Sequence, residues 1–177
     1  MIMALSLSVS AFAEEIPLFS DPDGEDFLSA EHGDASADGV YSFNPWDFFG
    51  VGGFWGRNAA NVLNITIDEV KEIVEAGGAT FTMVFGGTSF GEGIPSLTFD
   101  FSEPQAAAKF VITPNDDGTY TATASIDDLY SQWTTNGKSL DDIGNLLVQP
   151  NFSNFVLYEA YITTGDVAEY NGTKYAS

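Results

Sequence analysis

The chain of 177 residues contains no cysteine, so it can form neither a disulfide nor a thiolate metal site. Histidine is almost as scarce: the single one, His32, stands in an acidic segment, and no Gly-x-Ser-x-Gly motif occurs. Both observations argue against a Ser-His-Asp hydrolase. Basic residues are few and scattered, namely Arg57, Lys71, Lys109, Lys138 and Lys174.

This shortage of basic residues excludes several classes of partner. The 26 acidic residues outnumber the five basic ones and give a net charge of −21. Nucleic-acid binding requires clustered Lys and Arg that replace the counterions of the phosphates, so we expect none. Anionic membrane surfaces and other polyanions are disfavoured for the same reason. A neutral ligand or a divalent cation remains compatible with the charge.

The N-terminal segment "MIMALSLSVSAFA", residues 1–13, has the features of a signal peptide. It is apolar and ends in Ala11-Phe12-Ala13, the small-x-small pattern of a cleavage site. The basic region that usually precedes such a run is missing, which is compatible with a start further upstream. The run stops at Glu14, short of the roughly 20 residues that a membrane span needs. We therefore expect a secreted or cell-surface protein whose mature chain does not insert into a membrane.

Residues 14–39 carry nine acids and neither Lys nor Arg, and we interpret them as a solvated acidic leader. The alternative is a structural calcium site, because "DPDGED" at residues 21–26 offers closely spaced carboxylates. The spacing does not match an EF-hand loop, so no metal ligands are assigned. Residues 40–177 then form a single domain, which we expect to be a monomer.

Alternating apolar and polar residues predict strands through most of this domain. The predicted strands are 61–65, 79–86, 96–102, 109–113, 119–125, 145–149 and 154–163. Phe99 and Phe101 are expected to face inward with Leu97, and Val156, Tyr158, Ala160 and Ile162 are expected to share one face of the last strand. Asp117-Gly118 predicts a hairpin turn.

Two short helices interrupt the strands. Thr66 with Glu69 forms a capping-box pattern before one helix, and Gly77-Gly78 ends it. Ser125 begins the other, on which Trp133 stands in an apolar stripe and is expected in the core. The expected fold class is mainly β, a two-sheet antiparallel jelly-roll sandwich with two short crossover helices.

Two passages resemble carbohydrate-binding-module-like jelly rolls of secreted bacterial proteins, as found in plant-fibre-degrading anaerobes. They are "FWGRNAANVLNITIDEVKEIVEAGGATFTMVF" and "IDDLYSQWTTNGKSLDDIGNLLVQPNFSNFVLYEAYI", which together span residues 54–162. The similarity lies in the order of strands, capped helices and glycines. It implies a two-sheet sandwich that binds polysaccharide and performs no chemistry.

The stretch "FNPWDFFGVGGFWGRN", residues 43–58, holds six aromatic residues and fits no strand or helix period. Aromatic rings pack on the C–H faces of sugars, and neighbouring polar groups bind the hydroxyls. The candidate ligand-binding residues are therefore Trp46, Asp47, Phe48, Phe49, Phe54, Trp55, Arg57 and Asn58, with Phe90 in the loop "GGTSFGEG". Adjacent Phe48 and Phe49 cannot face one way on an extended segment, so one of them is expected in the core.

The predicted function is non-catalytic binding of a neutral polysaccharide by aromatic stacking. No cofactor is expected apart from the calcium alternative. A second hypothesis is a secreted structural or protein-interaction domain with no glycan ligand, since exposed apolar patches often mark interfaces. A third is a small glycoside hydrolase. It is disfavoured because no set of acids has assignable roles and the Glu-x-Asp-x-x-Glu pattern of jelly-roll glucanases is absent.

Overall fold

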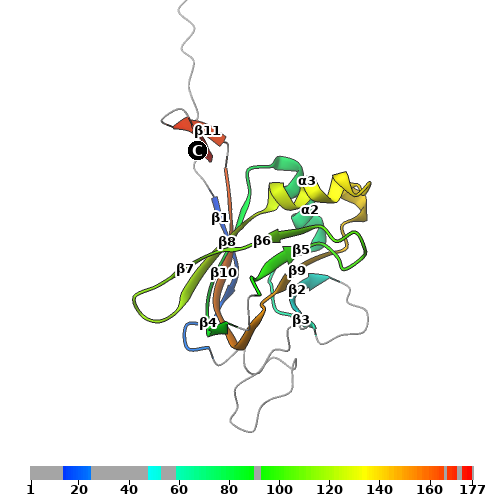
Figure 1. Ribbon diagram of the computed structural model, residues 1–177. Helices are drawn as coiled ribbons and strands as arrows, with labels where there is room; N and C mark the ends of the chain where they lie inside the picture. The colour runs from blue at the N-terminus through cyan, green and yellow to red at the C-terminus, as the bar shows by residue number, and fades with distance from the viewer. Residues whose placement is uncertain are drawn as a thin grey trace, which may run out of the picture.

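Two β-sheets form the body of the molecule in the computed structural model, which describes residues 14–24, 48–52, 59–89, 93–165, 167–170 and 173–176 (Figure 1). The first sheet has the strand order β1-β10-β4-β8-β7, and every neighbouring pair in it is antiparallel. Its strands are β1 (Glu14–Ser20), β10 (Phe152–Thr164), β4 (Thr80–Ser89), β8 (Tyr120–Ser125) and β7 (Val111–Pro114).

The second sheet has the order β3-β2-β9-β5-β6. Four of its strands pair antiparallel, and β3 is added in parallel at the edge. Its strands are β3 (Ala59–Asn61), β2 (Phe48–Gly52), β9 (Asn145–Gln149), β5 (Ser96–Thr98) and β6 (Ala107–Lys109). A separate hairpin, β11 (Val167–Tyr170) and β12 (Thr173–Ala176), follows β10.

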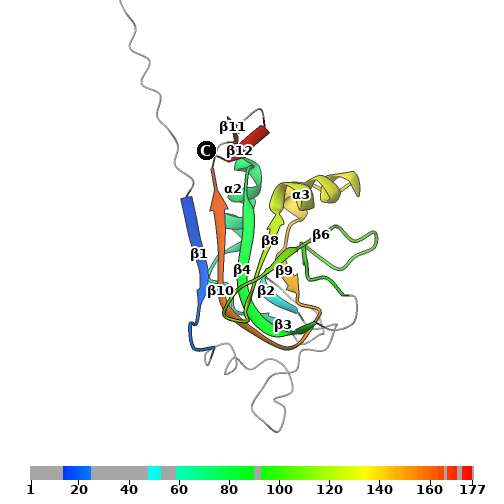
Figure 2. The same ribbon diagram turned by 60° about the vertical axis from the view of Figure 1, so that its left-hand side comes forward.

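Both helices connect one sheet to the other, as the sequence predicts. Helix α2 (Ile67–Ala76) joins β3 to β4, and α3 (Ile126–Thr135) with the 3-10 turn η1 (Leu140–Asp142) joins β8 to β9. The two helices lie at the same end of the molecule in both views (Figures 1 and 2). The mainly β, two-sheet sandwich with two crossover helices is thus confirmed. The strand order is compatible with jelly-roll connectivity, which stays a prediction.

The helix starts follow from local sequence. The Thr66 hydroxyl accepts from the Glu69 amide, and the Glu69 carboxylate accepts from the Thr66 amide at 2.8 Å, which completes the capping box. Gly77 ends α2 with a φ of 74°, a backbone conformation that favours glycine. Ser125 caps α3 through the Asp128 amide at 3.0 Å.

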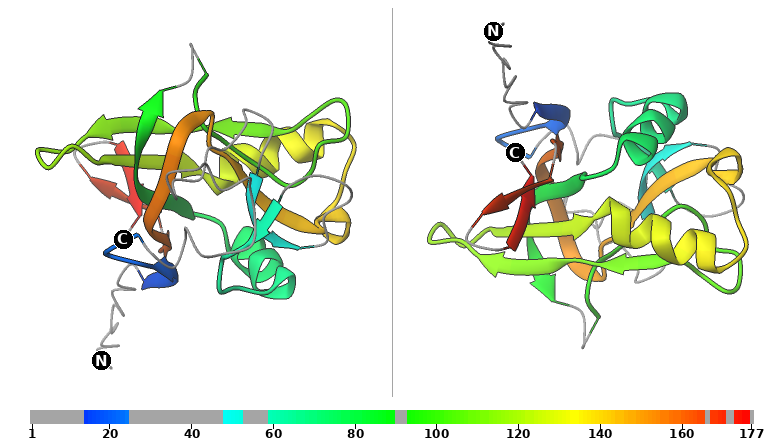
Figure 3. Two further views of the ribbon diagram at one scale, coloured as in Figure 1. Left: turned by 90° about the horizontal axis from the view of Figure 1, so that it is seen from below. Right: turned by 90° about the horizontal axis from the view of Figure 1, so that it is seen from above.

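Figure 3 shows the ribbons of the two sheets from below and from above. Side chains from both sheets fill the space between these layers. Phe85 lies at the centre, where its ring stacks on Phe155 and on Tyr120 at centroid distances of 5.1 and 5.4 Å. Trp133 is 2% exposed, which confirms its predicted place in the core. It meets Phe99 edge to face at 5.6 Å.

Several local predictions are wrong. Residues 14–20 are not a leader: they form edge strand β1, in which Leu18 is buried and Ile16 packs against the core. Residues 62–65 are not a strand, although Leu63 and Ile65 are buried. The sequence hides this strand because it begins with two acids, Glu14 and Glu15, and because a register shift between Pro17 and Phe19 breaks the alternation of its apolar residues.

The last strand also departs from simple alternation. A register shift between Leu157 and Glu159 inserts an extra residue, so Leu157 before it and Ala160 after it both face the core. Ile162 follows Ala160 inward, and Tyr158 does not share their face. The bulge means that Leu157 faces the core before the shift, where Val156 and Tyr158 were predicted to share a face with Ala160 and Ile162. β10 itself lies between β1 and β4, in a central position of the sheet.

Candidate functional site

Most of the predicted aromatic patch lies outside the described residues. Trp46, Asp47, Phe54, Trp55, Arg57, Asn58 and Phe90 belong to this group, and their predicted role stays a prediction. The two described members, Phe48 and Phe49, stand at the start of β2 and are 4% and 0% exposed. Neither ring is therefore available as a binding platform, and the expectation that one of the pair would be exposed is wrong.

The two phenylalanines are buried for different reasons. Phe49 points between the sheets, where its ring lies 5.5 Å from that of Phe155. Phe48 points the opposite way and is covered by Phe101, at a centroid distance of 3.9 Å. Phe101 itself is 44% exposed. Phe101, a described ring that is exposed here, is thus one that the sequence placed in the core.

Phe101 is displaced from the core because β5 ends at Thr98. The buried Thr98 hydroxyl accepts from the Asp100 amide at 3.2 Å and lies 2.7 Å from the Ala106 carbonyl oxygen. This turn interrupts the alternation that Leu97 and Phe99 had begun. The alternation of residues 96–102 continues past Thr98 in the sequence, so it gave no signal that the strand ends there.

A second candidate surface is the outward face of the first sheet. Phe81, Met83 and Ala122 are buried and point inward, so the residues between them point outward. We call this surface the threonine face; its uncharged members are Thr80, Thr82, Val84, Val111, Thr113, Thr121, Thr123, Tyr161 and Thr163. All of them except Thr82 are at least partly exposed, and Val111 is 70% exposed.

Strand pairing arranges these side chains in rows across the sheet. In one row Tyr161 pairs with Thr82, Thr82 with Thr123, and Thr123 with Val111. In the next row Val84 pairs with Thr121, which pairs with Thr113. Neighbours within a row are about 4.8 Å apart, and the rows are about 6.7 Å apart. The result is a regular surface of hydroxyl and methyl groups with one phenol ring.

On β4, β8 and β7 the threonine face carries no charged side chain, although the chain has a net charge of −21. Its charged members, Glu15 and Glu159, stand on β1 and β10 at one side of the face: Glu15 pairs with Thr163, and Glu159 pairs with Val84. Such a face can offer hydroxyl donors and acceptors, methyl contacts and the Tyr161 ring to a neutral ligand. The alternation Thr80-x-Thr82 and Thr121-x-Thr123 was visible in the sequence, but only strand pairing shows that the four residues are neighbours.

An ion pair is a further polar feature of the described surface. Beside Phe101, the Lys138 ammonium lies 2.7 Å from Asp100 Oδ2 and donates to Ser102 Oγ at 2.6 Å. Burial acts to raise the pKa of the Asp100 carboxyl, but the hydrogen bonds from Lys138 and Ser102 outweigh it and hold the pKa below its ordinary value. Within the part of the chain that the structure describes, no group of three or more His, Asp or Glu side chains is placed to hold a metal ion.

Comparisons with protein-family models, with curated proteins and with solved structures found no significant match. Among the described helices, none has the length and apolar character needed to cross a membrane.

Proposed function

We propose that this chain binds a neutral polysaccharide without catalysis, and that the threonine face is the surface that receives it. The observation that carries the proposal is a face of hydroxyl-bearing side chains that is uncharged across β4, β8 and β7 on a strongly acidic protein. On these three strands a neutral sugar chain buries no ionised side chain, whereas a charged ligand would find no counter-charge there.

The chemistry of the face suits sugars in two ways. Threonine hydroxyls both donate and accept hydrogen bonds, as sugar hydroxyls require. The Tyr161 ring offers a flat surface on which the C–H groups of a pyranose pack. Each neutral hydrogen bond contributes only about 0.5–1.5 kcal/mol, so a repeated array suits a repeated ligand better than a single small molecule.

Affinity electrophoresis of the full chain through gels with soluble β-glucan, xylan or mannan tests this proposal. We expect retardation by at least one of them. Tyr161→Ala and Thr123→Ala should reduce the retardation. The control is Thr134→Ala, which changes an exposed residue of α3 away from the face and should not reduce it. Trp46→Ala and Trp55→Ala test in parallel the contribution of the predicted aromatic patch.

The outcomes separate the three hypotheses. No retardation in any gel would overturn the polysaccharide proposal and leave the protein-interaction hypothesis. Retardation lost in Trp46→Ala and unchanged in Tyr161→Ala would keep the function but move the site from the threonine face. Release of reducing sugar by the pure protein would show a glycosidase instead.

A further inference from the structure

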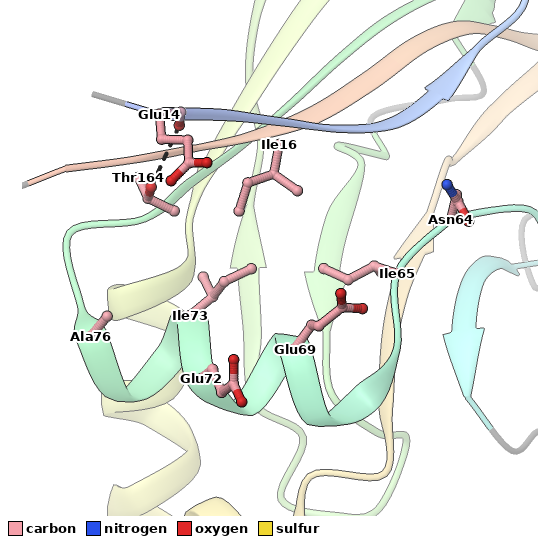
Figure 4. Close-up of a pocket in the computed structure, with 9 residues that line it drawn as sticks. All are labelled: Glu14, Ile16, Asn64, Ile65, Glu69, Glu72, Ile73, Ala76 and Thr164. Atoms are coloured by element: carbon pink, nitrogen blue, oxygen red, sulfur yellow. Dashed lines mark hydrogen bonds between the residues drawn. The ribbon is translucent and has the colours of Figure 1, made fainter. Parts of the chain in front are cut away.

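A groove of about 360 Å³ lies between strand β1 and helix α2, as Figure 4 shows. Its floor is apolar and is formed by Ile16 of β1, Ile73 of α2, and Ile65 in the segment before α2. Three carboxylates stand around it: Glu14, Glu69 and Glu72. The groove is separate from the threonine face, because Ile16 and Ile73 point toward the core side of the first sheet.

One side of the groove is the edge of a sheet. Among the strands that the structure describes, β1 is the outermost of its sheet and pairs only with β10. The chain already uses part of this edge: the Asn64 amide donates to the Leu18 carbonyl oxygen at 2.8 Å, and Ile65 then enters the groove. The edge continues from there toward Glu14, with the groove beside it (Figure 4). An extended segment of another chain can therefore pair with the edge of β1 beyond the point where residue 64 contacts it.

The three carboxylates around the groove, which we call its rim, determine the charge of the segment that can bind there. Glu69 accepts hydrogen bonds from the hydroxyl and the amide of Thr66, and these lower the pKa of its carboxyl, so it is ionised at neutral pH. A second copy of this chain is a poor occupant, because each copy has a net charge of −21 and only five basic residues. The complementary occupant is basic.

We propose that the groove between β1 and α2 docks an extended segment of a partner protein in which apolar residues alternate with Lys or Arg. Side chains alternate in direction along an extended chain, so the apolar ones contact Ile16 and Ile73 while the basic ones reach the rim carboxylates. This inference does not depend on polysaccharide binding.

Fluorescence anisotropy of the full chain with labelled synthetic peptides tests the proposal. The probe is Lys-Ile-Lys-Ile-Lys, and its controls are Lys-Gly-Lys-Gly-Lys and Ser-Ile-Ser-Ile-Ser. We expect the first peptide to bind at least about five-fold more tightly than either control, and its affinity to fall as salt is raised. Equal binding of the two lysine peptides would overturn the proposal, because attraction to the general acidity of the chain would then suffice.

Two charge reversals on one helix provide a matched comparison. Glu72 lines the groove and Glu75 does not, and both are exposed on α2. Glu72→Lys should lower the affinity for the Lys-Ile-Lys-Ile-Lys peptide about three- to ten-fold. Glu75→Lys should change this affinity less than two-fold. Ala76→Gln, which narrows the groove without changing charge, should also weaken binding. Equal effects of the two reversals would contradict the proposed site, and circular dichroism of each variant confirms that the fold is retained.

Discussion

The ammonium nitrogen of Lys138 lies 2.7 Å from Asp100 Oδ2 and connects the chain after α3 to the turn after β5. The same ammonium stands 4.4 Å above the Trp133 ring, which adds a cation–π contact. Asp100 also accepts a hydrogen bond from the Ser102 amide. The pair therefore holds the 99–104 turn, and with it the exposed ring of Phe101, against the end of the sandwich.

Asp100→Asn should destabilise the protein by about 0.5–1 kcal/mol at neutral pH, since both partners are partly exposed. The pKa of Asp100 is lowered in the folded state, so its contribution is present above the ordinary aspartate value and lost as pH falls through the folded pKa. Urea unfolding at pH 7 and at roughly pH 2 measures this. The difference from wild type should vanish in acid, and a difference that persists there would contradict the ion-pair account. Asp116→Asn, at the exposed hairpin tip, is the control.

Thr66→Ala should destabilise the protein by about 1 kcal/mol, because the Glu69 amide loses the side-chain oxygen that caps α2. Thermal unfolding measures the change. Thr66→Ser keeps the oxygen and should remain near wild type. If Thr66→Ala and Thr66→Ser lower the midpoint equally, the methyl group rather than the cap is responsible.

Gly50→Ala should prevent normal folding. A Cβ at Gly50 would lie 2.0 Å from the backbone oxygen of Leu146 on the paired strand β9, so the two strands could not keep their spacing. Gly118→Ala is the control, because a Cβ there meets nothing within 4 Å, although its φ of 87° still costs about 1 kcal/mol. Soluble expression and circular dichroism compare the two, and a well-folded Gly50→Ala protein would show that the β2–β9 contact is looser than described.

Trp133→Phe should cost about 2–3 kcal/mol. It removes the hydrogen bond from Nε1 to the Ser139 carbonyl oxygen at 2.8 Å, leaves that oxygen without this donor, and opens a small cavity beside Phe99. Chemical denaturation gives the value. A loss below about 0.5 kcal/mol would mean that the indole is not held by that bond.

Features set by short-range chemistry could be predicted from the sequence. The Thr66–Glu69 capping box, the Ser125 cap and the buried face of α3 depend on residues three or four positions apart. The hairpin at Asp117-Gly118 belongs to the same class, because a turn needs only its own residues.

Features set by pairing between distant strands could not be predicted. The bulge at Leu157 and Glu159 exists because β10 must match β4, and nothing within residues 154–163 marks it. The threonine face has the same origin: Thr82 and Thr123 are 41 positions apart and become neighbours only through the β4–β8 register. The burial of Phe48 could not be predicted because the ring that covers it, Phe101, belongs to the turn after β5, far away in the sequence.

The pairing of Glu14 with Thr164 has a mechanical consequence. Force applied through these two positions acts on register partners at one end of the β1–β10 ladder. The load would therefore open the hydrogen-bonded pairs one after another, as in a zipper, instead of shearing all of them together. Under tension from its two ends the sandwich should yield first by peeling β1 away, and so should extend at low force however stable it is in solution.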